Sequence, residues 1–162
     1  MCSNFDVFVA LEAGFAPTPE EVGRRMMKSA NLCKGKVLYD LGSGDGTLLI
    51  IAAEEFEARA VGVEIQGMLV TQSRNRIRNL GLKSKIKVVK GDFFKVDLGD
   101  ADVVALYLTP WALKALRSKL ENELKRGARV VVYKYAIEGW KPKKTVDAED
   151  GSGENKIFLY AL

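Results

Sequence analysis

The amino-acid sequence predicts an α/β fold, with a doubly wound and mostly parallel sheet of seven strands that ends in an antiparallel hairpin. Short runs typical of buried strands alternate with helical segments along most of the chain, and parallel strands need such long connections. A glycine-rich turn follows the first strand pattern, and the alternation stops after Tyr135. With 162 residues, we expect residues 1–162 to form a single domain.

The first half of the chain predicts an opening helix and two strand–helix repeats. Thr18 is the expected N-cap of the opening helix, which has proline at its first position and continues to about Asn31. The strand and helix patterns that follow cover residues 36–41, 47–56, 60–64 and 68–80. Gly81 stands where helices commonly end.

The second half predicts three more parallel strands and then the hairpin. The parallel strands are expected at residues 86–90, 102–108 and 128–133. The last two are joined by a helix that begins at a Thr109-Pro110 cap and ends before Gly127. One face of this helix carries leucines, namely Leu113, Leu116, Leu120 and Leu124. Residues 144–149 and 156–162 flank a turn sequence at 150–153, which indicates antiparallel pairing.

Composition excludes several kinds of chemistry. The chain has no histidine, so Ser-His-Asp and Cys-His relays and histidine-ligated zinc are excluded. Its two cysteines, Cys2 and Cys33, lack CxxC spacing, so we expect no disulfide framework and no metal site. No apolar run approaches 18 residues, and no signal sequence is evident. We therefore expect a cytoplasmic protein without a membrane partner.

The net charge of +4 is a mild excess that is largely local. Between Thr71 and Lys95 the chain has eight basic residues and one acid. Most of this basic segment, Arg74 to Lys95, falls late in a helix and early in a strand, at the edge opposite the expected ligand site. We interpret it as a solvated face, through which nucleic acid could bind only indirectly.

Ligands of such sheets bind beyond the carboxyl ends of the strands. There the sequence has a glycine loop, Gly42-Ser43-Gly44-Asp45-Gly46, in which glycines allow close approach of the backbone. Asp40 and Asp45 flank amides that would otherwise cradle a pyrophosphate, and their carboxylates would repel such an anion. A ligand with positive charge fits better, and S-adenosylmethionine has a sulfonium and an ammonium group.

Two further strand ends carry acids. Glu64 ends the second strand, 22 residues after Gly42, where a carboxylate can accept bonds from both ribose hydroxyls. Asp92 closes the third strand and is expected to accept from an adenine amino group, with Phe93 beside the ring. Each of these acids, taken alone, is most simply interpreted as a solvated loop residue. Their succession along one edge favours a binding site.

These motifs carry a family resemblance. Asp40-Leu-Gly-Ser-Gly-Asp-Gly46, Val61-Gly-Val-Glu64 and Gly91-Asp-Phe-Phe94 resemble the class I S-adenosylmethionine-dependent methyltransferases. Phe15-Ala-Pro-Thr-Pro-Glu-Glu-Val22 is similar to the short archaeal Dot1-like protein-lysine methyltransferases and their mitochondrial relatives. The resemblance spans Phe15 to the C-terminus. It implies a Rossmann-like fold, S-adenosyl-L-methionine as cofactor, and Pro17 and Thr18 folded over that cofactor. The expected cofactor-binding residues are Pro17, Thr18, Asp40, Gly42, Ser43, Gly44, Gly46, Glu64, Asp92 and Phe93.

Methyl transfer from a sulfonium depends mainly on alignment of nucleophile and methyl group. A lysine amine must arrive neutral, and an apolar aromatic channel favours the neutral form. The residues expected to take part in catalysis are Tyr107, Thr109 and Trp111. Phe93, Tyr133 and Trp140 are further candidates for the channel.

Three functions remain open from the sequence. The preferred one is methylation of exposed lysines on protein substrates, because a single short domain has no room for a dedicated target-recognition domain. The second is methylation of RNA or a small molecule, and the third is non-catalytic nucleotide binding. Residues 1–16 are expected to form an N-terminal lid or a docking segment.

Overall fold

The structure, a computed structural model, describes residues 15–162 and contains one seven-stranded sheet. The strands are β1 (Val37–Leu41), β2 (Arg59–Glu64), β3 (Ile86–Lys90), β4 (Val103–Leu106), β5 (Arg129–Tyr133), β6 (Lys144–Asp147) and β7 (Lys156–Ala161). The helices are α2 (Glu20–Ser29), α3 (Thr47–Glu55), α4 (Gly67–Asn79) and α5 (Pro110–Glu123). The part of the chain expected as a lid or docking segment, residues 1–16, lies outside the described residues except for Phe15 and Ala16.

The strands follow the order β3-β2-β1-β4-β5-β7-β6. The first five are parallel, and β7 pairs antiparallel with both β5 and β6. Because the order reverses direction at β1 and β4, the crevice for ligands is expected at the carboxyl ends of these strands. The predicted doubly wound sheet with a C-terminal antiparallel hairpin is confirmed.

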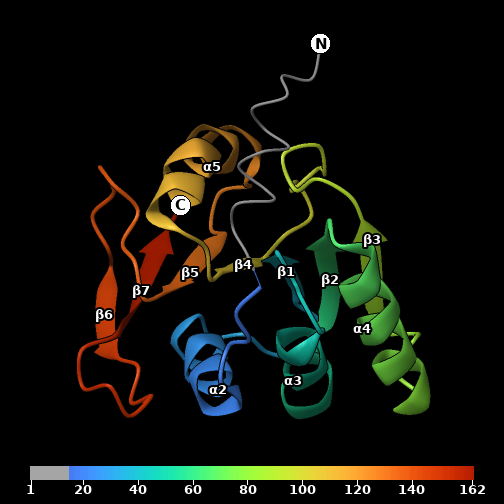
Figure 1. The fold of residues 1–162 in the computed structure, drawn as a ribbon. Helices are drawn as coiled ribbons and strands as arrows, with labels where there is room; N and C mark the ends of the chain where they lie inside the picture. Colours follow the sequence, from blue (N-terminus) through green and yellow to red (C-terminus); the bar gives the residue numbers. More distant parts are fainter. Residues whose placement is uncertain (1–14) are drawn as a thin grey trace.

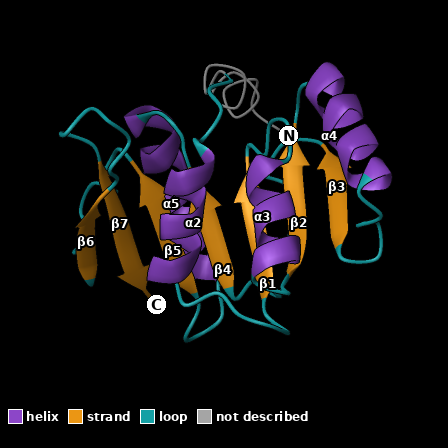
Figure 2. Cartoon of the chain, turned by 90° about the horizontal axis from the view of Figure 1, so that it is seen from below, coloured by secondary structure: helices purple, strands orange, loops and turns teal. Residues whose placement is uncertain are grey.

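Helices cover the two faces of the sheet unequally. Figures 1 and 2 show α2, α3 and α4 on one face, and Figure 1 shows α5 on the other. The first face buries a core between Met26 of α2, Leu49 of α3 and Leu38 of β1. On the second face Leu113 and Leu116 of α5 pack with strand side chains. The connection from β3 to β4 is a loop without a helix, residues 91–102.

The start of α2 differs from the prediction. The helix begins at Glu20, its N-cap is Pro19, and no side chain caps it. Thr18 as N-cap is therefore wrong, because Pro19 keeps an extended conformation, with φ −55° and ψ 138°, and delays the helix by one residue. The side chain of Thr18 is left to line a cavity instead.

The chain between β4 and α5 places side chains at the carboxyl edge of the sheet. β4 ends at Leu106, two residues earlier than predicted, so Tyr107 lies beyond the strand. The hydroxyl of Thr109 accepts a hydrogen bond from the backbone of Ala112 at 3.3 Å, which confirms the predicted cap. Leu113, Leu116 and Leu120 are buried as predicted.

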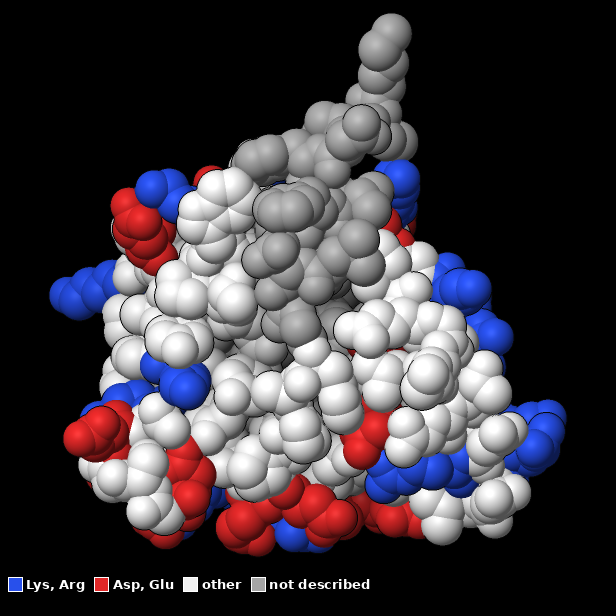
Figure 3. Space-filling model, in the orientation of Figure 1, with Lys and Arg blue, Asp and Glu red and all other residues white. Residues whose placement is uncertain are grey.

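Charged side chains are unevenly distributed over the surface. Figure 3 shows Lys and Arg gathered on the flank formed by α4 and β3.

Among residues 15–162, no helix combines the length and apolar character that crossing a bilayer requires.

Candidate active site

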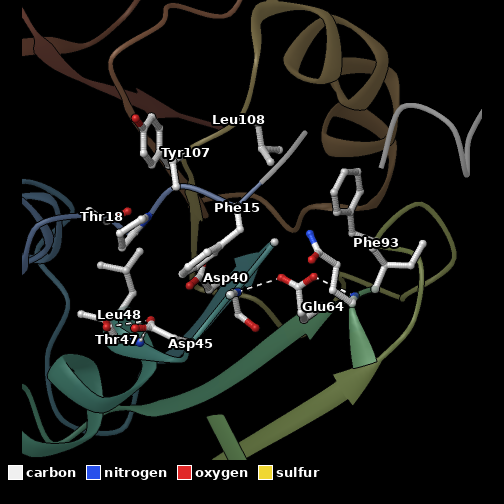
Figure 4. A pocket seen from close by; sticks show the side chains of 17 residues that line it. Phe15, Thr18, Asp40, Asp45, Thr47, Leu48, Glu64, Phe93, Tyr107 and Leu108 are labelled. Carbon is white, nitrogen blue, oxygen red and sulfur yellow. Dashed lines mark hydrogen bonds between the residues drawn. The ribbon is translucent and has the colours of Figure 1, made fainter. Parts of the chain in front are cut away.

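A cavity opens at the carboxyl ends of β1, β2 and β4, between the glycine loop and the segment that precedes α2 (Figure 4). Most of the residues predicted to bind a ligand line it, namely Pro17, Thr18, Asp40, Gly42, Ser43, Gly44, Glu64, Phe93 and Tyr107. The sequence therefore predicted the position of the cavity and much of its lining.

Four predicted site residues are not part of the lining. Gly46 ends the loop and packs next to α4, where a Cβ would lie 3.0 Å from the side chain of Ser73. Asp92 is buried next to Phe93 in the chain, and Thr109 caps α5. Trp111, in the first turn of α5, is 56% exposed.

The cavity also contains residues that were not among the predicted site residues, namely Phe15, Ala16, Asp45, Thr47, Leu48, Ile65, Gln66 and Leu108. Their positions follow from their neighbours in sequence. Leu108 follows Tyr107, and Gln66 stands two residues after Glu64. A rule that extends each strand end by two residues would have found both of these.

The glycine loop needs residues without side chains. Gly42, Gly44 and Gly46 have φ angles of +86°, +52° and +83°. Such angles are costly for other residues. The loop thereby turns its backbone toward the cavity. At Gly44, a Cβ would also lie only 2.5 Å from the ring of Phe15.

Glu64 holds the loop in place. One carboxylate oxygen accepts from the backbone N–H of Gly44 at 2.8 Å, and the other accepts from Gln66 at 2.9 Å. Glu64 is buried, and its carboxylate lies beside the cavity (Figure 4). Each oxygen keeps a further lone pair for a ligand hydroxyl.

Three carboxylates gather on this side of the cavity. Burial raises the pKa of Asp40 to about 8, and the nearby charges of Glu64 and Asp45 add to this shift. Asp45 accepts from Thr47 at 2.8 Å and pairs with Arg76 at 3.0 Å. A positive charge placed beside Asp40 would favour its ionised form, so a wall made of Asp40 and Glu64 suits a cationic ligand.

Asp92 has an unsatisfied oxygen. Its Oδ1 accepts from the backbone of Phe94 at 2.9 Å. Its buried Oδ2 has no hydrogen-bond partner in the part of the chain that the structure describes, and the ammonium of Lys95 is 4.0 Å away. A buried acceptor of this kind is costly unless a donor reaches it. An amino group of a bound adenine is a donor of the required kind.

Aromatic rings stand on the other side of the cavity. Tyr107 packs on Tyr133, with 4.6 Å between ring centroids. The hydroxyl of Tyr133 donates to Asp150 at 2.5 Å, and burial together with this bond raises the pKa of the Tyr133 phenol. Trp140, the other channel candidate, packs on Tyr160 and donates to Glu121, away from the cavity lining.

The ring of Phe15 lines the cavity and lies against Gly44, on the side of Asp40 in the view of Figure 4. Phe15 is nonetheless 45% exposed. A ligand of nucleoside size requires this side chain to move aside.

Among the described residues, no group of three His, Cys, Asp or Glu side chains is arranged to hold a metal ion.

Comparison with known proteins agrees with this site. A family model described as the ANTKMT methyltransferase domain matches residues 40–144, which include both the glycine loop and Glu64. A protein-lysine N-methyltransferase of Saccharolobus islandicus is 40% identical over 149 residues, covering 91% of this chain and 92% of its own. The mouse adenine nucleotide translocase lysine N-methyltransferase is 31% identical over 85% of this chain, which spans 59% of that relative's length.

A solved structure is similar over the same range. It is a crystal structure described as an RNA methyltransferase from Salinibacter ruber in complex with S-adenosyl-L-homocysteine. It superposes with a TM-score of 0.85 at 37% identity, covering 90% of this chain and 93% of the other.

Proposed function

The chain belongs to the family of the ANTKMT methyltransferase domain, and on this basis we propose that it transfers methyl groups from S-adenosyl-L-methionine to lysine ε-amines of proteins. The Saccharolobus relative of nearly equal length has the name of a protein-lysine N-methyltransferase. Two mouse relatives are named as lysine N-methyltransferases of ATP synthase and of the adenine nucleotide translocase. Their common chemistry is methylation of a lysine side chain.

The observation that carries the proposal is the pairing of an acidic wall with an aromatic wall in one cavity. Asp40 and Glu64 form the acidic wall, and Tyr107 stands on the other side. S-adenosyl-L-methionine supplies an electrophilic methyl group on a positively charged sulfur. The acidic wall attracts this charge, whereas it would repel the pyrophosphate of a dinucleotide.

In this proposal, different residues contact different parts of the cofactor. Glu64 accepts from the ribose hydroxyls, and the free oxygen of Asp92 accepts from the adenine amino group. Phe93 packs beside the adenine. The backbone of Gly42 and Gly44 borders the methionine portion, and Pro17 and Thr18 close the cavity from the side of α2.

Tyr107 faces the acceptor in this proposal. A free lysine has a pKa of about 10.4 and is protonated at neutral pH, so its nucleophilic form is scarce. Contact with an apolar ring removes water and favours the neutral amine. Tyr107 is held for this purpose by packing on Tyr133, which is itself tied to Asp150. Thr109 contributes by capping the helix that follows, and Trp111 lies exposed in the first turn of that helix.

A second candidate function is methylation of RNA. The description of the Salinibacter structure favours it. Against it, the residues after β4 read Tyr107-Leu108-Thr109-Pro110, which differs from the Asp/Asn-Pro-Pro-Tyr run of amino-adenine methyltransferases. Protein substrates with exposed lysines are therefore the preferred partners.

The proposal includes a cytoplasmic location. It is supported by Cys33, an exposed free thiol, which is typical of a reducing compartment. Cell fractionation with an antibody against the native protein tests this part.

The function is tested by incubating the purified protein with S-adenosylmethionine labelled in the methyl group and with a cell extract. Digestion of parallel samples with protease or ribonuclease then locates the label. Label that is released only by protease supports the proposal, and label that is released only by ribonuclease refutes it.

A further inference from the structure

A second concave surface lies at the opposite edge of the sheet. It is a groove of about 480 Å³ on the face that carries α5, beside the first residues of β1, β2 and β3. The strand register places Val37 beside Arg59, and Tyr39 beside Val61, which in turn lies beside Lys87. These side chains share one face, so the groove has an apolar floor and a basic wall. Residues 91–102, which connect β3 to β4, contain no helix that could cover the groove.

The charge of this groove is unbalanced. Five basic residues line it, namely Arg59, Lys83, Lys85, Lys87 and Lys125, against two acids, Asp100 and Asp102. Asp102 is already engaged, since Lys125 lies at 3.0 Å and Lys36 at 3.6 Å from its carboxylate. Within residues 15–162, the side chains of Arg59, Lys83 and Lys87 have no hydrogen-bonding or ion-pair partner. Lys85, by contrast, donates to the backbone carbonyl of Ala53 at 3.5 Å. The cations of the wall that are free to meet an anionic partner are therefore Arg59, Lys83 and Lys87.

The arrangement of the free basic residues selects the kind of anion. Arg59 and Lys87 flank Val61 on one face of the sheet, and Lys83 lies in the turn that precedes β3, an edge strand. Acidic side chains of a protein partner would complement these three cations. Aliphatic side chains beside them would meet Val37 and Val61 on the floor.

Single-stranded RNA fits the groove less well. Proteins that bind single strands usually stack bases on exposed aromatic rings. The groove has one aromatic residue, Tyr39, and only 9% of its surface is exposed. The floor thus offers aliphatic contact but no stacking platform.

We propose that this groove docks an extended acidic and aliphatic segment of a protein substrate, at a distance from the lysine that is methylated. β1 runs from Val37 in the groove to Leu41, whose neighbours Asp40 and Gly42 line the catalytic cavity, a rise of about 13 Å over four residue steps. A folded substrate can span this distance, so the groove contributes affinity while the cavity performs the chemistry. The proposal rests on the proposed function only in assigning the segment to a protein substrate.

Direct binding without cofactor tests the groove separately from methyl transfer. The probe is a fluorescein-labelled peptide of twelve residues made of Glu-Glu-Val-Val repeats, which presents both residue types on each face of an extended chain. The comparison probe is a labelled oligouridylate of twelve nucleotides. The variant Lys83→Gln/Lys85→Gln/Lys87→Gln is matched by Lys141→Gln/Lys143→Gln/Lys144→Gln. The matched variant loses the same charge from exposed lysines outside the groove, at or before β6.

We expect the wild-type protein to bind the peptide, and the groove variant to bind it about tenfold more weakly, with the matched variant within about twofold of wild type. Hydrogen exchange of the wild-type protein should show that the peptide protects the amides of residues 83–90, which checks the site without any substitution. Absence of peptide binding, equal losses in the two variants, or unchanged exchange at residues 83–90 would overturn the proposal. Tighter binding of oligouridylate that only the groove variant loses would assign the groove to RNA instead. Because no methyl transfer is measured, failure of the proposed function leaves these outcomes unchanged.

Discussion

The carboxylate of Glu64, at the end of β2, accepts a hydrogen bond from the backbone N–H of Gly44 at 2.8 Å. This bond ties the tip of the glycine loop after β1 to the neighbouring strand. The same carboxylate borders the cavity. One side chain therefore shapes the loop and is also positioned to bind the ligand.

Replacement of Glu64 by Gln should weaken cofactor binding about tenfold or more. One oxygen becomes an NH2 group that faces a backbone donor, either Gly44 or Gln66. The clash should also lower the free energy of unfolding by about 1–3 kcal/mol. Calorimetric titration with S-adenosylhomocysteine and urea unfolding measure the two effects. Glu54→Gln, an exposed change on α3, is the control, and equal affinities in the two variants would contradict the role given to Glu64.

Gly44→Ala should abolish measurable cofactor binding. The new Cβ would project into the cavity, on the side where the Phe15 ring lies 2.5 Å away, and would occupy space that the cofactor needs once Phe15 moves aside. It would also force a non-glycine residue to a φ of +52°. Gly35→Ala is a matched control, since Gly35 has a φ of +83° and open space around it. Both variants should lose about 1–2 kcal/mol of stability from backbone strain, and only Gly44→Ala should lose the cofactor. Normal titration of Gly44→Ala would refute the assignment of the loop.

Asp40 should make the stability of the cofactor-free protein depend on pH. Its pKa rises from 3.8 to about 8 on folding, mainly because of burial. The folded state then holds a proton that the unfolded state has lost, so this group lowers stability as pH rises from about 4 to 8 and adds no further change above that. Asp40→Asn removes this contribution. The melting temperature of the variant relative to wild type should therefore be higher at pH 9 than at pH 5, and an equal difference at both values would contradict the burial of an ionisable Asp40.

Tyr107 should contribute to catalysis through its aromatic ring and not through its hydroxyl. Tyr107→Phe keeps the packing on Tyr133 at 4.6 Å between centroids and should retain kcat within about twofold. Tyr107→Ala removes the ring that faces the acceptor lysine. It should lower kcat about tenfold or more, because the lysine amine is then less well aligned with the methyl group. Cofactor affinity should change little in either variant. Steady-state methylation of a protein mixture measures kcat. Equal kcat values for the two variants would contradict a role of the Tyr107 ring in catalysis.

Sequence patterns located the cavity because parallel strands end at a common edge. Asp40, Gly44 and Glu64 are each recognisable as the residues that follow or end a strand, and their meeting at one cavity follows from the order of the strands. The N-cap of α2 was mispredicted because a local motif does not reveal the extended conformation of Pro19. Local sequence signals predict such single-residue details poorly.

Contacts between distant parts of the chain were beyond sequence reasoning. The bond from Tyr133 to Asp150 exists because the β6–β7 hairpin folds back along β5, and no spacing in the sequence indicates it. The basic groove likewise requires the register that sets Val61 beside Lys87. The sequence alone showed a basic run, whereas the fold shows that part of it forms one wall of a groove.

The most direct test of the central claim is the chemical identity of the methylated product. Wild-type protein and Gly44→Ala are incubated with a cell extract and methyl-labelled S-adenosylmethionine. The recovered proteins are hydrolysed to amino acids and the recovered nucleic acids to nucleosides, and both hydrolysates are separated by chromatography. The account predicts that the label comigrates with Nε-methylated lysines in the wild-type reaction and is missing from the Gly44→Ala reaction. Label recovered in nucleosides, in another amino acid, or equally with both proteins would contradict it.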